Sequence, residues 1–493
     1  MKILFIYNAT EVLGIEYLSS FLKSKGHETC LLFDPMVFGG DVFIDNAFLT
    51  KRLNLDRKII DRAIELKPDL VAFSTYTGNY QWALRIAKAI RHLSNIPIVF
   101  GGVHPSAVPE RVLLNEFIDY VIVGEGEYAM LDLVEHLMSN GSKDQLANTQ
   151  NICFKYNRQL FLNQPRPYIS DLDTLPFPDK ALFYDKIPLL KCNPYLIMTS
   201  RGCPYRCTYC SNEMYQNLHS HDKLHVRRRS PDNVIEELCN IKKEGLMKRI
   251  VFMDDVFTLQ KSWLEEFSEK YQTKIGLPFS CLVHPMSMSK DIAILLKETG
   301  CCLVGIGIQS GSERIREMIY NRKGSNDRIK QAMSYLHAAK INVYVDHILG
   351  APTETQEDLE ESLALYREIK PDMVFTFWLT YYPKTSIIQK ARELGILSES
   401  DINKIEEGFI GYTHGTGAVS EKDIPMFVRY ELLFGLSALC RSQYLQPLLA
   451  KITPFIPFKK LISYFIFVIV GIRYNKDSII TKFRFALTKH NVP

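Results

Sequence analysis

Five short apolar runs alternate with amphipathic helical patterns over the first 140 residues of this 493-residue chain. Parallel strands need crossover connections of about a dozen residues or more, usually a helix, so the alternation predicts a doubly wound, Rossmann-like α/β domain over residues 1–140. The expected strands are residues 2–7, 28–34, 70–75, 98–101 and 120–123. The expected helices are residues 15–25, 52–66, 80–93, 109–117 and 128–138.

Small and polar residues follow most of these strands, in the segments 8–14, 74–79, 101–105 and 124–127. Sheets of this kind bind ligands at the carboxyl ends of their strands. Glycine there lets the backbone approach a bulky ligand, although glycine also shapes ordinary tight turns. The segments are therefore candidates for a ligand site.

Residues 141–190 are polar and then rich in proline, and we expect them to form a linker without sustained secondary structure.

A second alternating series occupies residues 191–390. Its expected strands are residues 195–200, 249–254, 279–284, 303–309, 342–349 and 373–381. Its expected helices include residues 231–243, 261–272, 290–299, 327–339 and 357–369. Six strand–helix units predict a partial (βα)6 TIM-like barrel, with an open sheet as the alternative. Mostly helical patterns follow over residues 391–493.

Three cysteines lie within eight residues after the first strand of this second series, at Cys203, Cys207 and Cys210. Thiolates are the usual ligands of iron–sulfur clusters, and a 4Fe-4S cube normally takes four of them. Three thiolates leave one iron open to the amino and carboxylate groups of a small molecule. The alternative is a structural zinc site with His221 or His225 as the fourth ligand, although such sites normally use two separated ligand pairs.

The spacing Cys-x3-Cys-x2-Cys, with Tyr209 before the last cysteine, resembles the radical S-adenosylmethionine (SAM) superfamily. The surrounding Ser-Arg-Gly-Cys-Pro resembles the cobalamin-binding branch of that superfamily, and the resemblance extends over about residues 1–390. It implies that the three cysteines hold a 4Fe-4S cluster that cleaves SAM reductively to a carbon radical. Tyr209 is an expected cofactor contact by the same resemblance.

Other residues at strand ends take cofactor-binding roles by this resemblance. The segment after the second barrel strand is expected to meet the amino group of SAM, and the segment after the fourth suits its ribose and carboxylate. The two aspartates could otherwise simply cap the next helix. The candidates are Met253, Asp254 and Asp255 in the first segment and Gln309, Ser310 and Glu313 in the second.

The resemblance also implies that the first domain holds cobalamin against the barrel mouth. Many cobalamin domains supply a histidine to cobalt from the loop after the first strand, but residues 8–14 contain none. This favours cobalamin without a histidine ligand, and the alternative is a domain that no longer binds the cofactor. The expected contacts are Ser74, Thr75, Gly101, Gly102, Gly124, Glu125 and Gly126.

Basic residues are concentrated at the end of the chain, although the net charge is only +4. So small a net charge argues against nucleic acid as a partner. Residues 451–493 hold eight Lys or Arg against one acid, Asp477. The apolar run 461–472 is too short to span a bilayer, and predicts a helix that lies on an anionic membrane or packs on protein.

Eleven cysteines without a secretory signal favour a cytoplasmic protein.

These features together favour a cobalamin-dependent radical SAM methyltransferase. Its substrate is expected to be a small-molecule or lipid-like compound methylated at an unactivated carbon, with flavodoxin or ferredoxin as electron donor. The same radical chemistry can end in cyclisation, ring contraction or oxidation, and no residue separates these outcomes. The alternative from another class is a non-catalytic metal-binding scaffold.

Overall fold

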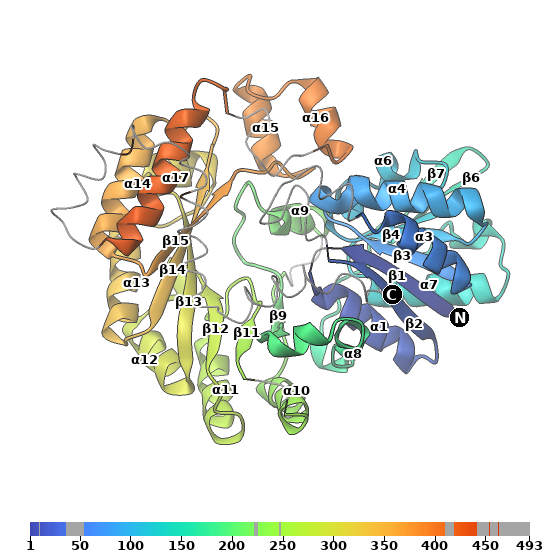
Figure 1. Cartoon of the computed structure of the whole chain (residues 1–493), viewed down its shortest axis with the longest axis horizontal. Helices are drawn as coiled ribbons and strands as arrows, with labels where there is room; N and C mark the ends of the chain where they lie inside the picture. The colour runs from blue at the N-terminus through green and yellow to red at the C-terminus, as the bar shows by residue number, and fades with distance from the viewer. Residues whose placement is uncertain are drawn as a thin grey trace.

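The computed structural model describes residues 1–440, except 9, 36–53, 221–224, 246–247 and 410–418, together with residues 453 and 462. Two α/β units face each other across the molecule (Figure 1). The predicted fold class is confirmed: a doubly wound N-terminal unit precedes a partial barrel and a helical C-terminal region. His221 and, apart from residue 462, the apolar run 461–472 lie outside the described residues.

The N-terminal sheet has seven strands in the order β2-β1-β3-β4-β5-β6-β7, and the first five in this order are parallel. Helices cover both of its faces, which is why the parallel strands are buried along most of their length. The strands are β1 (Lys2–Asn8), β2 (Glu28–Asp34), β3 (Leu70–Ser74), β4 (Ile98–Gly101), β5 (Tyr120–Ile122), β6 (Ile152–Tyr156) and β7 (Gln159–Leu162). The helices are α1 (Leu13–Ser24), α3 (Asp56–Glu65), α4 (Thr77–Leu93), α5 (Val103–Ala107), α6 (Pro109–Leu113) and α7 (Glu127–Met138).

The segment 141–190 corrects the expectation of a linker without structure. Strand β6 pairs antiparallel with β5, and β7 pairs antiparallel with β6, so this segment extends the N-terminal sheet. Asn157 and Arg158 both have positive φ, 49° and 64°, which is the geometry of a two-residue hairpin turn. Helix α8 (Ala181–Tyr184) adds Phe183 to the core on the same sheet.

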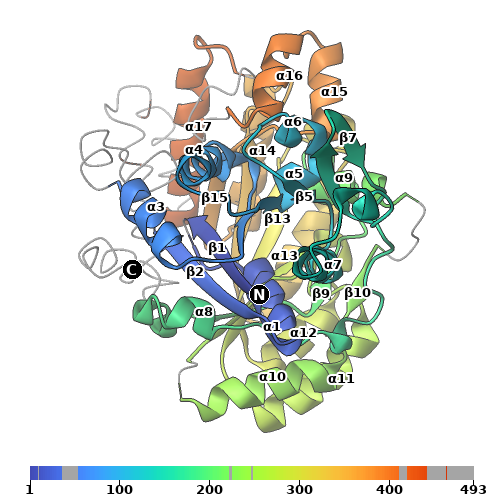
Figure 2. The same cartoon turned by 90° about the vertical axis from the view of Figure 1, so that its right-hand side faces the viewer.

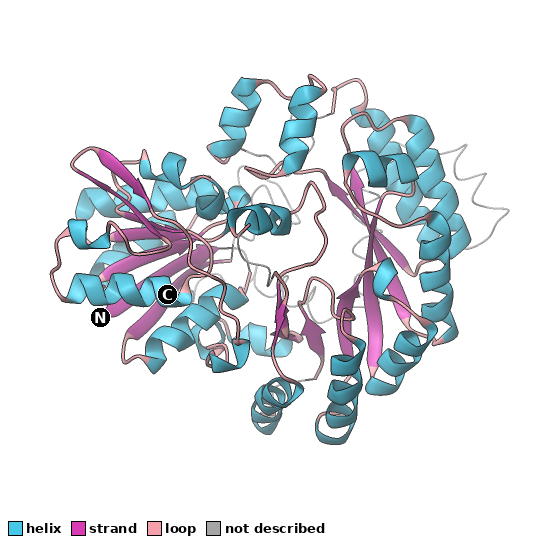
Figure 3. Ribbon diagram, turned by 180° about the vertical axis from the view of Figure 1, so that it is seen from behind, coloured by secondary structure: helices cyan, strands magenta, loops and turns pink. Residues whose placement is uncertain are grey.

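The second sheet has six parallel strands in the order β15-β14-β13-β12-β11-β8, with helices on its outer side (Figure 3). Because β8 and β15 stand at opposite ends of this order, hydrogen bonds do not close the sheet into a full barrel. The strands are β8 (Tyr195–Ile197), β11 (Ile250–Phe252), β12 (Phe279–Val283), β13 (Cys301–Gln309), β14 (Asn342–Leu349) and β15 (Met373–Trp378). The helices are α10 (Pro231–Lys243), α11 (Lys261–Lys274), α12 (Lys290–Thr299), α13 (Asn326–Ala338) and α14 (Gln356–Ile369).

The described C-terminal helices are α15 (Ser386–Glu393), α16 (Glu399–Glu406) and α17 (Ile424–Leu439). Helix α17 packs on α14 and β15, whereas α15 and α16 lie beside the barrel mouth (Figures 1 and 2). Glu406 accepts a bond from Arg111 of the N-terminal unit (3.0 Å) and pairs with Lys384 (2.9 Å). Helix α16 therefore bridges the two units. No helix among the described residues is long and apolar enough to cross a membrane.

Candidate active site between the two units

The three cysteines lie in a loop between the short strand β9 (Ser200–Arg201) and helix α9 (Ser211–Leu218). Gly202 begins this loop with φ +88°, and a Cβ there would lie 1.8 Å from the carbonyl oxygen of His225. Only glycine therefore fits. Gln216 of α9 donates its side-chain amide to the carbonyl of Cys203 (2.6 Å), which ties the loop to the helix that follows it.

The thiols of Cys203 and Cys210 are half-buried, and that of Cys207 is buried. Burial, with smaller contributions from Asp255 and the other two cysteines, raises the pKa of Cys203 to about 12. Burial likewise raises the pKa of Cys210 to about 11. Cys207 is 5% exposed, and its Sγ accepts an N–H bond from Arg322 (3.5 Å). A metal centre that takes Cys203 and Cys210 as thiolates must therefore displace their protons.

The donor set fits an iron–sulfur cluster. Among the described residues, no three His, Cys, Asp or Glu side chains converge on one point, as the ligands of a single metal ion would. A cubane does not require such convergence, because each cysteine binds a different iron. Three thiols in one short loop are the ligand type that this cluster uses.

The two aspartates after β11 have different environments. Asp254 is fully buried and accepts bonds from the backbone N–H of Thr199 (3.1 Å), the hydroxyl of Thr199 (2.6 Å) and the hydroxyl of Ser200. It therefore holds the connection between β8 and β9. Asp255 and Met253 instead line a cavity between the two units. Burial raises the pKa of the Asp255 carboxyl.

The remaining predicted contacts in the barrel have protein neighbours of their own. Tyr209 packs edge-on against Tyr320, with ring centroids 4.9 Å apart. Gln309 ends β13 with φ +72°, where the pairing with β14 is irregular. Ser310 is fully buried, and the Glu313 carboxylate accepts the backbone N–H of Asn326. None of these four predicted contacts lines the cavity.

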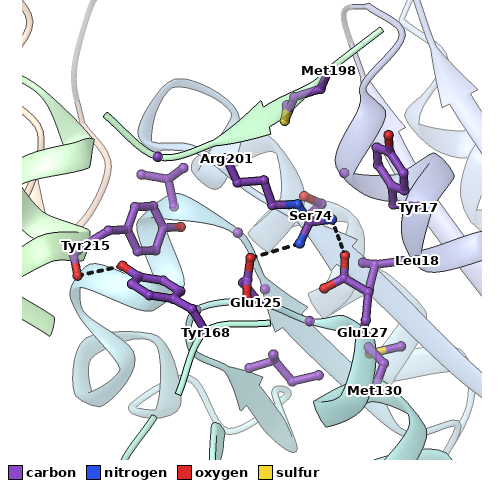
Figure 4. Close-up of a pocket in the computed structure, with 18 of the residues that line it drawn as sticks. Tyr17, Leu18, Ser74, Glu125, Glu127, Met130, Tyr168, Met198, Arg201 and Tyr215 are labelled. Atoms are coloured by element: carbon purple, nitrogen blue, oxygen red, sulfur yellow. Dashed lines mark hydrogen bonds and ion pairs between the residues drawn. The ribbon is translucent and has the colours of Figure 1, made fainter. Parts of the chain in front are cut away.

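The cavity has a volume of about 440 Å³, and both units contribute walls to it (Figure 4). Its N-terminal walls come from the carboxyl ends of the parallel strands, where ligands of such sheets bind. Six of the seven predicted cobalamin contacts line it: Ser74, Gly101, Gly102, Gly124, Glu125 and Gly126. The barrel side contributes Met198, Ser200, Arg201, Gly202, Asn212, Tyr215, His225, Arg227, Met253 and Asp255.

Two glycines with positive φ form part of the N-terminal wall of the cavity. Gly102 has φ +98°, and a Cβ at this position would lie 2.6 Å from the carbonyl oxygen of Thr75. Gly124 has φ +81°, and its Cβ would lie 3.2 Å from Asn151. Thr75 does not line the cavity; its backbone N–H donates to the Gly101 carbonyl (2.7 Å). A side chain at either position would crowd neighbouring protein atoms on a backbone with positive φ, so bare backbone forms the wall of the cavity there.

A network of buried ion pairs crosses the rim of the cavity. Arg201 of β9 contacts Glu125 (2.9 Å) and Glu127 (2.6 Å) of the N-terminal unit (Figure 4). Arg227 of β10 (Arg227–Arg228) contacts Glu125 at 2.7 Å. The two arginines lower the pKa of the Glu125 carboxyl, although burial alone would raise it. The carboxylate therefore stays ionised and joins the two units.

Several cavity residues were not predicted from the sequence. Arg201 belongs to the Ser-Arg-Gly-Cys-Pro motif, but no role was predicted for it, and Arg227 belongs to no distinguishing motif. Tyr168 comes from the expected linker, and its hydroxyl donates to the carbonyl of Tyr215 (3.1 Å; Figure 4). Arg227 stacks over the Tyr168 ring at 4.3 Å. His225 was considered only as a zinc ligand, and it lines the cavity.

Asp346 of β14 is a further ionisable group that the sequence did not single out. Burial raises the pKa of its carboxyl from 3.8 to about 7, against the opposing effect of Arg322. Between these two values the folded protein binds more protons than the unfolded chain, so stability falls as pH rises through this window. We expect Asp346→Asn to raise the free energy of unfolding by about 2 kcal/mol more at pH 8 than at pH 5. Urea unfolding at both pH values measures this, and an equal effect at both would contradict the assignment.

Comparisons with known proteins agree with this geometry. A family model described as "Radical SAM superfamily" matches residues 197–366, and one described as "B12 binding domain" matches residues 5–134. The chain is 31% identical over 336 residues to "Uncharacterized methyltransferase PH0819" of Pyrococcus horikoshii, covering 66% of this chain and 69% of that protein. It is 23% identical over 418 residues to an anaerobic magnesium-protoporphyrin IX monomethyl ester cyclase of Cereibacter sphaeroides, covering 80% of this chain and 64% of that enzyme.

Solved structures show the same fold. The radical SAM methyltransferase TsrM from Kitasatospora setae aligns with a TM-score of 0.62 at 17% identity, over 79% of this chain and 76% of TsrM. The cobalamin-dependent SAM radical enzyme OxsB aligns with a TM-score of 0.66 at 16% identity, over 100% of this chain and 75% of OxsB. The two family matches imply an iron–sulfur cluster, SAM and cobalamin as cofactors. The chain therefore belongs to the radical SAM superfamily and is a radical SAM enzyme with an N-terminal B12-binding domain.

Proposed function

We propose that this enzyme transfers a methyl group to an unactivated carbon of a small-molecule substrate. The observation that carries the proposal is the shared cavity: its walls include Gly124 of the B12-binding unit and Asp255 beside the cysteine loop. Groups bound by the two units would therefore face each other across one shared cavity. The Pyrococcus horikoshii relative, which is named as a methyltransferase and is 31% identical, supports methyl transfer.

Within this proposal, the barrel residues hold the cluster and SAM. Cys203, Cys207 and Cys210 are the proposed iron ligands. Met253 and Asp255 are the proposed contacts for the amino group of SAM, because they line the cavity. Asp254 positions the β8–β9 connection from which the cysteine loop begins. For the ribose and carboxylate the proposal retains Gln309, Ser310 and Glu313, as the resemblance implies.

The N-terminal residues would hold cobalamin. Gly102 and Gly124 present bare backbone to the cavity, which lets a corrin approach closely, and Ser74 and Glu125 supply polar groups at the same rim. When bound, the cluster with SAM supplies a carbon radical, and cobalamin supplies a transferable methyl group. The contribution of the chain is to orient these groups and to exclude water from the space between them.

The test is product analysis after anaerobic reconstitution of the full chain with iron, sulfide and cobalamin. Candidate tetrapyrroles, peptides and lipids are incubated with SAM that carries a deuterated methyl group. We expect deoxyadenosine, S-adenosylhomocysteine and a substrate that contains the deuterated methyl. Deoxyadenosine with a cyclised or oxidised product that lacks the label would contradict methyl transfer and favour the chemistry of the cyclase relatives.

The proposal includes a one-electron donor such as flavodoxin or ferredoxin, because cleavage of SAM consumes an electron. The proposal also places the enzyme in the cytoplasm.

A lipid-like substrate and membrane contact depend on the basic segment 451–493, most of which lies outside the described residues. A vesicle-binding assay with anionic lipid, compared with a chain ended at residue 450, tests that part separately.

A further inference from the structure

Arg322 brings a cation against the cysteine loop from a distant part of the chain. Its Nη1 lies 3.5 Å from Sγ of Cys207, within reach of an N–H···S hydrogen bond, and its Nη2 donates to the carbonyl of Gly307. An arginine side chain keeps its proton in proteins. A protonated arginine is thus fixed beside one proposed cluster ligand.

The fold around Arg322 is built to hold the guanidinium in this place. A Cβ on Gly307 would lie 2.7 Å from the side-chain amide nitrogen of Gln309 and 3.0 Å from Nη2 of Arg322, so the glycine leaves room for both side chains at the end of β13. The backbone N–H of Arg322 donates to the carbonyl of Arg316 (2.7 Å). The preceding Asn321 donates its side-chain amide to the carbonyl of Arg206, inside the cysteine loop (2.9 Å). The arginine and the loop are therefore fixed relative to each other.

We propose that Arg322 is a positioning residue that raises the reduction potential of the cluster through its bond to Cys207. This inference rests on the proposed function, because it takes Cys207 as a cluster ligand. Reduction adds one negative charge to the cluster. A fixed cation that donates to a ligand sulfur in a water-poor site stabilises the reduced state more than the oxidised state, and hydrogen bonds to sulfur and net charge are known determinants of these potentials.

The neighbouring Arg206 provides a natural contrast. It precedes Cys207 in sequence, but its side chain is exposed and its guanidinium bonds to Asn217. Water screens a charge in that position. The effect should therefore belong to Arg322 and not to positive charge near the loop in general.

The experiment is a redox titration of the anaerobically reconstituted full-length protein, followed by electron paramagnetic resonance. We expect Arg322→Gln to make one-electron reduction about tenfold less favourable, which is a shift of about 59 mV to lower potential. Arg322→Lys keeps the charge but not the planar donor, and should recover part of the shift. Arg206→Gln is the matched control and should keep the wild-type potential.

Gly307→Ala tests the same bond without removing the charge. The added methyl crowds both the Gln309 side chain and the guanidinium, and we expect a shift in the direction of Arg322→Gln. If Arg322→Gln fails to assemble a cluster, the reduction potential of Gly307→Ala tests the role of the Arg322–Cys207 bond instead. Iron and sulfide contents are measured for every variant.

Wild-type potentials in every variant that assembles a full cluster, Gly307→Ala included, would overturn this inference alone. Failure of the wild-type protein to form any cluster would instead overturn the proposed function. A role of Arg322 in folding only would lower cluster content or stability and leave the potential of the assembled cluster unchanged.

Discussion

Replacing Cys203, Cys207 or Cys210 by alanine is expected to abolish reductive cleavage of SAM. Each substitution removes one of only three thiols that the loop offers, and an incompletely ligated cluster is lost or rearranged. Deoxyadenosine formation should fall to the rate of protein prepared without iron. The measurement is deoxyadenosine release by chromatography under reducing, anaerobic conditions, together with iron and sulfide content.

Cys239→Ala is the matched control for these variants. Its thiol is half-buried, like those of Cys203 and Cys210, but it packs against the barrel core and stands outside the loop. We expect this variant to cleave SAM at the wild-type rate. Retention of both cluster iron and SAM cleavage in any of the three loop variants would refute the assignment of the ligands.

The second large effect concerns the ion pairs at the cavity rim. Arg201→Met should lower the free energy of unfolding by about 3–5 kcal/mol, because it leaves a buried carboxylate without its guanidinium. The Glu127 side chain is only 5% exposed and lies 2.6 Å from Arg201. Glu125 retains Arg227 in the variant. Urea unfolding followed by tryptophan fluorescence measures the loss.

Two companion variants separate this effect from an ordinary surface pair. Arg392→Met breaks the exposed contact with Glu399 and should cost no more than about 1 kcal/mol. In a double variant with Arg201→Met, Glu127→Gln removes the stranded charge and should recover part of the loss. A cost for Arg201→Met as small as that for Arg392→Met would show that the network does not join the two units energetically.

The regular part of the fold was predictable because both series obey one rule, a short apolar run followed by an amphipathic helix. Strands β2, β4 and β14 have the predicted bounds. The hairpin of β6 and β7 was missed for a local reason. Its turn is Asn157-Arg158, which lacks the glycine that is usual in a two-residue turn, and the apolar run of β7 is only three residues long.

The candidate site was predictable where the backbone alone decides it. Glycines at strand ends and closely spaced cysteines are visible in the sequence, and the glycines do line the cavity. Side-chain direction is not visible. The neighbours Asp254 and Asp255 look equivalent in sequence, yet one is bonded inside the protein and the other faces the cavity. Arg201, Arg227 and Arg322 act across the fold, where local pattern carries no information.

The rim network has a consequence for evolution and for protein engineering. Its carboxylates lie in one unit and its arginines in the other, so exchanging either half with that of a relative that lacks the matching residues would strand a charge at the interface. Recombination between the N-terminal unit and the barrel is therefore expected to destabilise the protein unless both partners of each ion pair are inherited together. The two halves should descend as a matched set, and chimeric enzymes should be designed with these four positions transplanted as one block.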